Sequence, residues 1–428
     1  MKESQFNRGM LNFLKKSPTP FHAVLNMSAI LDKAGFQRLS ESDAWALKKE
    51  GRYYVTRNGS SVIAFTTGQA DFPETGIRMA GAHTDSPCLK VKPLPEKVSH
   101  SYLQIGVEVY GGALLNPWFD RDLSLAGRVT WLTSEETVES ALVDFESPVA
   151  VIPSLAIHFD REANKNKSVN PQDELPPILL QVEDNDEALF FRDILADRLR
   201  AEHPEADVAE ILGYEISLYD TQPPAQTGMN REFITGARLD NLMSCHTGLM
   251  ALIGASGDLP CLLVCNDHEE VGSASVSGAQ GPFLEAVLSR LCPKAEDRLR
   301  AIDRSLMISA DDAHGVHPNY AAKSDPGHGP LLNHGPVIKI NASQRYASDS
   351  ETVAAFRHLC RRADVPVQDF VMRSDLACGS TIGPLTATRI GVKTVDVGVP
   401  IFAMHSVREM AGSRDGFYLF RALGQHYA

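Results

Sequence analysis

The chain has 428 residues, 43% of them hydrophobic, with 41 basic and 54 acidic residues and a net charge of −13. Because a single hydrophobic core stops growing at roughly 250 to 300 residues, we expect two domains. The negative charge argues against nucleic acid or an anionic membrane as a partner. The sequence has neither an apolar run that would span a bilayer nor an apolar N-terminal signal core, so we expect a cytoplasmic protein.

The seven cysteines are scattered along the chain, and no two of them form a Cys-x-x-Cys pair. An odd number of isolated thiols favours free, buried cysteines over a disulfide framework. The same pattern argues against a metal site built from thiolates.

The N-terminal region combines helical and strand patterns. Apolar residues at helical spacing extend over residues 1–35, with a breaker at Ser17 to Pro20. Strands are expected over Tyr53 to Phe65 and over Gly76 to Gly81. The second strand leads into His83 and Asp85. These elements predict the first part of an α/β domain.

From about Pro93 the pattern changes to alternating polar and apolar residues, which is typical of an antiparallel sheet with one solvated face. Strands are expected over Leu103 to Tyr110, Leu123 to Leu132 and Glu215 to Tyr219, with a turn-rich stretch at residues 161–177 and a helix over Asp186 to Glu202. A breaker at Pro223 and Pro224 ends this region. The pattern predicts an inserted β-rich domain.

After Phe233 short apolar strands again alternate with helices. Helices are expected over Asn241 to Ala255 and Ser350 to Ala363, and strands over Cys261 to Cys265, Leu306 to Ser309, Val337 to Ile340 and Thr394 to Val399. The run from Cys261 to Cys265 is apolar on both faces, which is typical of a buried parallel strand. It stops abruptly in Asp267, His268, Glu269 and Glu270.

Side chains of metal-ligand types follow several of these elements. In a parallel sheet the carboxyl ends of the strands share one edge, so the residues that follow them can converge. The candidates come from five places in the chain: His83, Asp240, Glu269 with Glu270, Asp311 and His405. Oxygen and imidazole donors favour Zn²⁺ or another first-row divalent ion, with Mn²⁺ or Co²⁺ as alternatives in one site. The set exceeds the needs of one catalytic zinc, so we expect two ions that share a bridging carboxylate.

Each position also has a structural alternative. A lone histidine such as His83 is more often a hydrogen-bonded structural residue than a ligand. Asp240 precedes a helix, where aspartate commonly caps the N-terminus. Asp311 has Asp312 beside it, which could take its place. The conjunction of motifs, and no single spacing, indicates the metal site.

Six motifs carry a resemblance to a known family. They are Ala80 to Pro87, Gly111 to Leu123, Phe233 to Leu242, Asn266 to Ser273, Ile308 to Asp311 and Met404 to Glu409. In this order they resemble the M18 metallopeptidases, the aspartyl aminopeptidase family, and the block Pro-Trp-Phe-Asp-Arg-Asp at residues 117–122 separates this family from other two-zinc aminopeptidases. The resemblance extends from Ser17 to Glu409 and implies an α/β fold, a mixed-sheet two-zinc exopeptidase domain with an inserted domain.

The resemblance implies a role for each site residue. Two zinc ions are expected with Asp240 as the bridge: His83, Asp240 and Asp311 for one ion, and Asp240, Glu270 and His405 for the other. Glu269 is the implied general base, which takes a proton from a zinc-activated water and passes it to the leaving amine. Asp85, two residues beyond His83, is expected to fix the orientation of that imidazole. The residues alone do not rank Glu269 against Glu270.

The resemblance also implies that the enzyme removes Asp or Glu from the N-terminus of short peptides. Lys339 and His314 match positions that resemble the family's specificity pocket, where an ammonium would attract an acidic side chain. Without the resemblance Lys339 is equally well a surface lysine at a strand edge. Asp312 stands where the family commonly has an apolar residue, and its carboxylate would weaken the acidic preference.

The expected domains are a catalytic domain of residues 1–92 and 235–428 and a β-rich dimerisation domain of residues 93–234. In the family, dimers build a tetrahedral dodecamer that encloses the active sites, so a homododecamer is implied here. His158 matches a histidine that reaches the active site of the partner, whereas Ser154 replaces a histidine often found in that block.

Other functions remain open at this point. A two-zinc amidohydrolase or deacylase would use the same metals on a different substrate, and an aminopeptidase with a non-acidic preference would differ only in its pocket. A catalytically idle shell, valued for assembly, is a further alternative. The presence of every expected ligand argues against the idle shell.

Overall fold

The computed structural model describes residues 1–182 and 190–428, and contacts between residues divide the chain into two units. The main unit comprises Met1–Ser86, Pro224–Met404 and Glu409–Ala428, and the inserted unit comprises Pro87–Pro223 and His405–Arg408. The inserted unit begins at Pro87 and its main segment ends at Pro223, both earlier in the chain than the expected boundaries after residues 92 and 234. The reason is pairing: the strand Cys88–Ser99 (β5) already belongs to the inserted sheet, and Ala225–Thr227 (β11) already pairs within the main unit.

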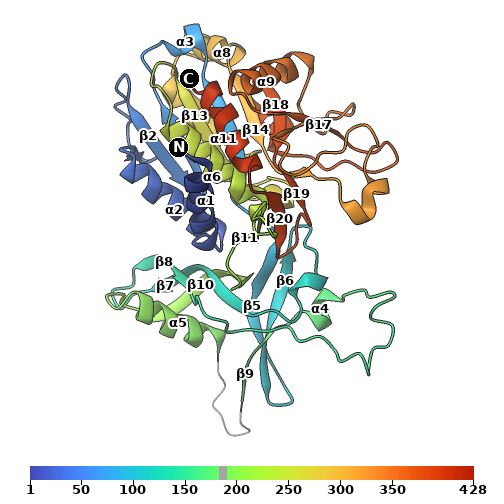
Figure 1. Ribbon diagram of the computed structural model, residues 1–428. Coiled ribbons are helices and arrows are strands. Elements are labelled where there is room, and N and C mark those ends of the chain that lie inside the picture. The colour runs from blue at the N-terminus through green and yellow to red at the C-terminus, as the bar shows by residue number, and fades with distance from the viewer. Residues whose placement is uncertain (183–189) are drawn as a thin grey trace. The chain divides into compact units, whose positions relative to one another are not determined.

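The main unit is built on a nine-stranded sheet (Figure 1). Its spatial order is β1 (Gln37–Leu39), β2 (Arg52–Arg57), β3 (Ser61–Thr66), β13 (Cys261–Asn266), β4 (Arg78–His83), β14 (Leu306–Ala310), β18 (Lys393–Gly398), β16 (Val337–Ile340) and β17 (Gln368–Val371). The central strands β13, β4, β14 and β18 are parallel, whereas β3 and β16 pair antiparallel on either side of them. The sheet is therefore mixed, as expected, and the carboxyl ends of its four central strands share one edge.

Helices cover the sheet and connect its strands. They are α1 (Glu3–Lys15), α2 (Pro20–Lys33), α3 (Phe72–Thr75), α6 (Leu239–Ile253), α7 (Phe283–Leu291), α8 (Ala295–Asp303), α9 (Ser350–Arg362), α10 (Ile382–Ile390) and α11 (Asp415–His426). The predicted helices at residues 241–255 and 350–363 correspond to α6 and α9. None of the helices in the described ranges combines the length and apolar character needed to cross a membrane.

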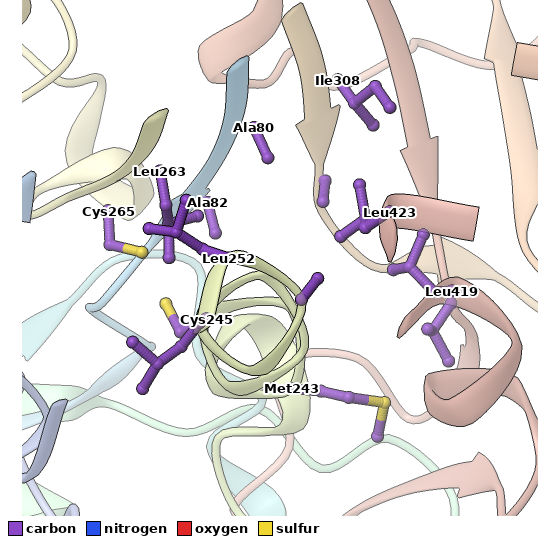
Figure 2. Packing of buried hydrophobic residues seen from close by; sticks show 14 of the residues in the cluster. Ala80, Ala82, Met243, Cys245, Leu252, Leu263, Cys265, Ile308, Leu419 and Leu423 are labelled. Atoms are coloured by element: carbon purple, nitrogen blue, oxygen red, sulfur yellow. The ribbon is translucent and has the colours of Figure 1, made fainter. Parts of the chain in front are cut away.

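Strand β13 is buried on both faces, as its apolar sequence predicts. Leu263 and Cys265 belong to one core cluster, which includes residues of α1, α2, α6, α9 and α11, whereas Leu262 and Val264 belong to a second, which includes residues of α7 and α8. Figure 2 shows Leu263 and Cys265 beside Cys245 of α6. Burial of one leucine stabilises a fold by roughly 1.5 to 3 kcal/mol. The side chains on both faces of β13 therefore hold this strand in the sheet. The strand in turn positions the charged turn that follows it.

The strand predicted over Tyr53 to Phe65 is two strands. β2 and β3 form an antiparallel hairpin whose connection contains Asn58 and Gly59. Both residues have positive φ, 54° and 66°, which is the backbone that Asn-Gly adopts in a tight hairpin turn. The Asn-Gly pair could therefore have located this turn from the sequence.

A second, five-stranded sheet completes the main unit. Its order is β11, β12 (Phe233–Gly236), β20 (Glu409–Gly412), β19 (Pro400–Phe402) and β15 (Ala313–His314). β15 follows β14 directly in the chain, and β19 follows β18. The segments that leave two central strands of the large sheet thus enter the small one.

The inserted unit contains a six-stranded antiparallel sheet, as the alternating pattern predicts. Its order is β8 (Val138–Asp144), β7 (Leu123–Leu132), β10 (Glu210–Asp220), β5, β6 (Tyr102–Tyr110) and β9 (Ile178–Gln181). Helix α5 (Phe191–Glu202) packs Phe191, Leu195 and Leu199 into the core of this unit, and α4 (Pro171–Glu174) lies in the turn-rich stretch. Of the helix expected over residues 186–202, positions 186–189 lie outside the described residues.

Candidate metal centre

His83 is the last residue of β4 and lies where three parallel strands end. It is in register with Asn266 at the end of β13, and Asp311 follows β14 immediately on the other side. The His83 imidazole is buried, and its Nε2 lies 3.3 Å from Asp240 Oδ1 and 3.3 Å from Asp311 Oδ1. Residues from distant parts of the chain thus converge at this edge, as the order of strands predicts.

Asp85 fixes the other side of the imidazole. Nδ1 of His83 lies 3.1 Å from the carbonyl oxygen of Asp85 and 3.4 Å from its Oδ1. An N–H at Nδ1 leaves Nε2 as the nitrogen that faces Asp240 and Asp311, which is the arrangement of a metal-binding histidine held by an outer carboxylate. Burial alone would lower the pKa of His83. Hydrogen bonds to these three carboxylates outweigh burial and raise the pKa well above its ordinary value.

Asp240 lies at the start of α6, where the helix is interrupted by non-helical backbone at Asp240 and Asn241. Arg238 occupies the cap position, and the backbone of Asp240 is extended, with φ −75° and ψ 108°. Its amide donates to Glu409 Oε2 at 3.1 Å, and its carbonyl accepts from Ser86 Oγ at 2.6 Å. The side chain of Asp240 is directed to His83, as expected of a metal ligand, and its role at the metal stays a prediction.

Three of the predicted ligands form a compact set that fits a metal ion. One ligand atom from each of His83, Asp240 and Glu270 lies within 4.8 Å of the other two. An imidazole with carboxylate oxygens is the donor set that Zn²⁺ accepts. Burial of like-charged carboxylates is costly without a cation, so the residues present fit a divalent ion.

Glu269 and Glu270 follow β13 in the short turn η2 (Glu269–Val271). Burial raises the pKa of Glu269 to about 8, helped by the charges of Asp311, Asp240 and Asp85 and opposed by His83. Burial, with Asp240 next, raises the pKa of Glu270 well above its ordinary value. Burial thus favours the protonated form of both glutamates, and only Glu270 falls within the compact group with His83 and Asp240. Their separate roles as base and ligand stay predictions.

Asp311 is paired with a buried lysine. Nζ of Lys339, on β16, donates to Asp311 Oδ2 at 3.1 Å and to the carbonyl oxygen of Asp312 at 3.0 Å. Lys339 is only 2% exposed, so it is no surface lysine. Burial raises the pKa of Asp311, but Lys339 and His83 outweigh it and hold that pKa well below its usual range. Sequence reasoning missed this ion pair, because the lysine and the aspartate lie on strands that are not adjacent in the chain.

Asp312 is buried too, at 2% exposure, and among the residues that the structure describes neither of its carboxylate oxygens has a hydrogen-bond partner. Burial, then the charge of Asp240 and that of Glu409, raises its pKa well above the ordinary value. Its main chain, and not its side chain, contacts Lys339. Asp311 therefore supplies the carboxylate at His83, and Asp312 does not take its place.

His314 and Lys339 border one aromatic cluster. The His314 ring meets Phe370 edge-on with ring centres 5.7 Å apart, Phe370 meets Tyr346 at 6.5 Å, and Nζ of Lys339 lies 5.3 Å from the centre of the Tyr346 ring. The two residues expected in the specificity pocket thus border the same group of aromatic side chains.

Two predicted site residues belong to the inserted unit. Nδ1 of His405 lies 3.2 Å from the carbonyl oxygen of Gly112, and the His405 carbonyl accepts from the amide of Leu114 at 3.0 Å. The motif Gly111 to Leu123 therefore orients His405, which was not anticipated. His158 is exposed in an irregular segment. The metal role of His405 and the substrate role of His158 remain predictions.

Comparisons with known proteins identify the family of this chain. The sequence pattern of the family described as aminopeptidase I zinc metalloprotease (M18) matches residues 13–427. A probable M18 family aminopeptidase 2 of Pseudomonas aeruginosa is 59% identical over 426 residues, covering 99% of this chain and 98% of its relative, and one of Pseudomonas entomophila is 60% identical over 422 residues, covering 98% and 97%.

Solved structures agree with the fold. A cryo-EM structure of an Ape4 and Nbr1 complex superposes with a TM-score of 0.95 at 37% identity, covering 99% of this chain and 86% of that one. The crystal structure of prApe1 gives 0.91 at 30% identity, covering 98% and 94%. These matches confirm the resemblance and the fold class. The chain belongs to the M18 family of zinc metallo-aminopeptidases.

Proposed function

We propose that the enzyme removes an N-terminal Asp or Glu from short peptides with the aid of two Zn²⁺ ions. The observation that carries the hydrolytic part is the buried group of His83, Asp240 and Glu270 with Glu269 beside it. His83, Asp240 and Asp311 would hold one ion, and Asp240, Glu270 and His405 the other. Zn²⁺ in such a site supplies Lewis acidity and makes water a better nucleophile near neutral pH.

Glu269 is the residue that moves the proton. Its carboxylate takes a proton from the attacking water and delivers it to the amine that leaves when the peptide bond breaks. Burial raises the pKa of Glu269 to about 8 in the site without metal, which supports a role in proton transfer, and a nearby cation would bring that pKa down toward the operating pH. The backbone amide of Glu269 donates to Asp85 Oδ1, which anchors the turn that carries the group.

Lys339 and His314 support the acidic preference. The Lys339 ammonium stays charged, because Asp311 outweighs the effect of burial and raises its pKa. A buried cation and an imidazole that border the aromatic cluster provide two donors for a carboxylate side chain. Asp311 and Asp312 already occupy part of the lysine's hydrogen-bonding capacity, so the preference is expected to be moderate in strength.

We further propose a homo-oligomer, a tetrahedral dodecamer built from dimers through the inserted unit, in the cytoplasm. The similar mApe1 of Saccharomyces is described as a dodecamer, at 29% identity and a TM-score of 0.84. Exposed apolar side chains around His158, namely Leu155, Ile157 and Phe159, support an interface in this segment. All seven cysteines are free thiols, which fits a reducing compartment.

The test combines metal depletion with a substrate panel. The protein is stripped with a chelator, reloaded with Zn²⁺ and offered peptides that begin with Asp, Glu, Leu, Lys or N-acetyl-Asp. We expect turnover only after reloading, with Asp and Glu preferred and the acetylated peptide uncut. Cleavage of the acetylated peptide would instead identify a deacylase, and a clear preference for Leu or Lys would refute the acidic specificity.

A further inference from the structure

His268 immediately precedes the two glutamates and had no role in the sequence analysis. Its backbone lies in the left-handed region, with φ 64°. A residue other than glycine adopts this conformation at a cost of order 1 kcal/mol or more, and such positions cluster at functional sites. The unusual conformation lies at the point where β13 ends and the turn with Glu269 and Glu270 begins.

The His268 side chain bridges the two ends of the loop that carries these glutamates. Nδ1 lies 2.8 Å from Ser275 Oγ, and Nε2 lies 3.5 Å from Asp267 Oδ2. Ser275 Oγ also accepts the amide of Gly278 at 2.9 Å. Ser277 Oγ lies 3.4 Å from the same Nδ1, so this ring nitrogen contacts two serines of the segment that follows the glutamates.

The main chain of His268 closes the same loop. Its carbonyl accepts the amide of Ser273 at 2.7 Å and that of Val271 at 3.4 Å, and its amide donates to Asp267 Oδ1 at 2.8 Å. The bond between the His268 carbonyl and the Ser273 amide encloses residues 269–272, which include both glutamates. Both the main chain and the ring of His268 therefore contact the residues that flank the two glutamates.

Asp85 holds the turn from the other side. Its Oδ1 accepts the amide of Glu269 and its Oδ2 accepts the amide of Glu270, each at 3.1 Å. These bonds hold the two amides through one carboxylate. The bridge from His268 to Ser275 supplies a second, separate anchor.

We infer that His268 is a positioning residue: through Ser275 it sets the direction in which Glu269 and Glu270 project into the metal centre. This inference rests on the proposed hydrolysis for its effect on Glu269, whereas its effect on Glu270 concerns metal binding alone. The alternative is that His268 only fills space in the loop. The two roles predict different results for a substitution that keeps a polar side chain and tolerates the left-handed backbone. Such a side chain should restore Zn²⁺ binding and kcat only if His268 positions the turn.

The experiment compares His268→Ala, His268→Asn and Ser275→Ala in the full chain. Asparagine tolerates the left-handed backbone and keeps a short polar side chain, so it should restore part of the bridge. Zn²⁺ affinity is measured by competition with a chromogenic chelator, and kcat and KM are measured at saturating Zn²⁺. His100→Ala is a matched control, because His100 is also left-handed, with φ 51°, and its Nδ1 also lies 2.9 Å from a serine oxygen, Ser99 Oγ, but on the β5–β6 hairpin.

We expect His268→Ala and Ser275→Ala to weaken Zn²⁺ binding and to lower kcat by roughly 10- to 100-fold with KM unchanged. His268→Asn should recover much of both losses, and His100→Ala should match the wild type. Wild-type affinity and kcat in His268→Ala would overturn the inference, as would losses that asparagine does not reverse. If His268→Ala fails to fold, Ser275→Ala decides. A wild type that binds Zn²⁺ but cuts no peptide refutes the proposed function instead, and the affinity series still tests His268.

Discussion

The carboxylate of Asp85 accepts the backbone amide of Glu269 at 3.1 Å, although the two residues are 184 positions apart in the chain. The same carboxylate lies 3.4 Å from Nδ1 of His83. One buried side chain thus contacts both the His83 imidazole and the backbone of Glu269, so it couples the end of β4 to the turn after β13.

Replacement of Asp85 by Asn should separate this effect from simple loss of folding. The asparagine side chain keeps one oxygen, which can still accept one of the two backbone amides. Its NH₂ group is a donor and cannot accept the other amide. We expect kcat to fall roughly 10- to 100-fold, with weaker Zn²⁺ binding, because outer partners of a metal ligand have effects of this size. Kinetics at saturating Zn²⁺ and chelator competition measure the two losses. A wild-type kcat in Asp85→Asn would contradict this account of the site.

The two glutamates should respond differently to the same substitution. Glu269→Gln should lower kcat by roughly 10²- to 10⁴-fold, because it removes the general base, while Zn²⁺ remains bound. Glu270→Gln should instead lose Zn²⁺ affinity. Metal content and kcat, measured on both variants, check the division of roles.

An exposed glutamate offers the control for this pair. Glu285→Gln lies on α7, where the side chain reaches Arg389, and should leave both properties unchanged. If Glu269→Gln lost the metal while Glu270→Gln kept it, the roles of the two residues would be exchanged.

Stability of the metal-free protein should fall as pH rises. The pKa of Glu269 is about 8 in the folded protein, whereas the ordinary value of 4.5 applies to the unfolded chain. Between these pH values the folded chain holds a proton that the unfolded chain has released, so the free energy of unfolding decreases with increasing pH. Glu269→Gln cannot ionise and should lose this part of the slope. It should therefore be more stable than the wild type at the upper end of the window.

Urea unfolding of the metal-free proteins at both ends of that window measures the effect. Addition of Zn²⁺ should reverse the trend in the wild type, because the ion binds the deprotonated carboxylates. Parallel slopes for wild type and Glu269→Gln would show that burial of Glu269 does not control the pH dependence.

The arrangement of strands explains why much of the centre could be predicted. His83 ends β4, Asp311 directly follows β14, and Glu270 lies in the short turn after β13. Apolar runs locate such parallel strands in a sequence. Position along the chain then implies position in space, since the ends of parallel strands share an edge. The choice between Glu269 and Glu270 needed the family motif, because adjacent residues in a turn differ only in side-chain direction.

Other features depend on contacts that no local pattern encodes. The pairing of Lys339 with Asp311 joins β16 to the end of β14 across β18, and its existence depends on how side chains pack in the finished sheet. Likewise, His405 belongs to the inserted unit because Gly112 and Leu114 bind it. A sequence shows that these residues are present, but it does not show which neighbour forms the ion pair or hydrogen bond with each of them.

Lys339 offers a test of specificity and stability together. Lys339→Met removes the cation beside Asp311 and leaves a buried carboxylate without its partner, which should destabilise the metal-free protein by about 3 to 5 kcal/mol. It should also lower the turnover of Asp peptides relative to Leu peptides. Lys393→Met, an exposed lysine at the start of β18, is the control. An unchanged ratio of Asp to Leu turnover would exclude Lys339 from substrate selection.

Gly398 gives a prediction about the backbone that carries Asp311. A Cβ added at Gly398, at the end of β18, would fall on the carbonyl oxygen of Asp311 and press on Asp312 and Ala313. The backbone cannot yield as a flexible side chain would, so Gly398→Ala should displace Asp311, lowering both the melting temperature and Zn²⁺ affinity. Gly424→Ala is the matched control, because a Cβ there, within α11, meets no atom within 4 Å. Alanine should stabilise that helix by roughly 0.5 to 1 kcal/mol. If Gly398→Ala bound Zn²⁺ like the wild type, the close approach of β18 would have no part in positioning Asp311.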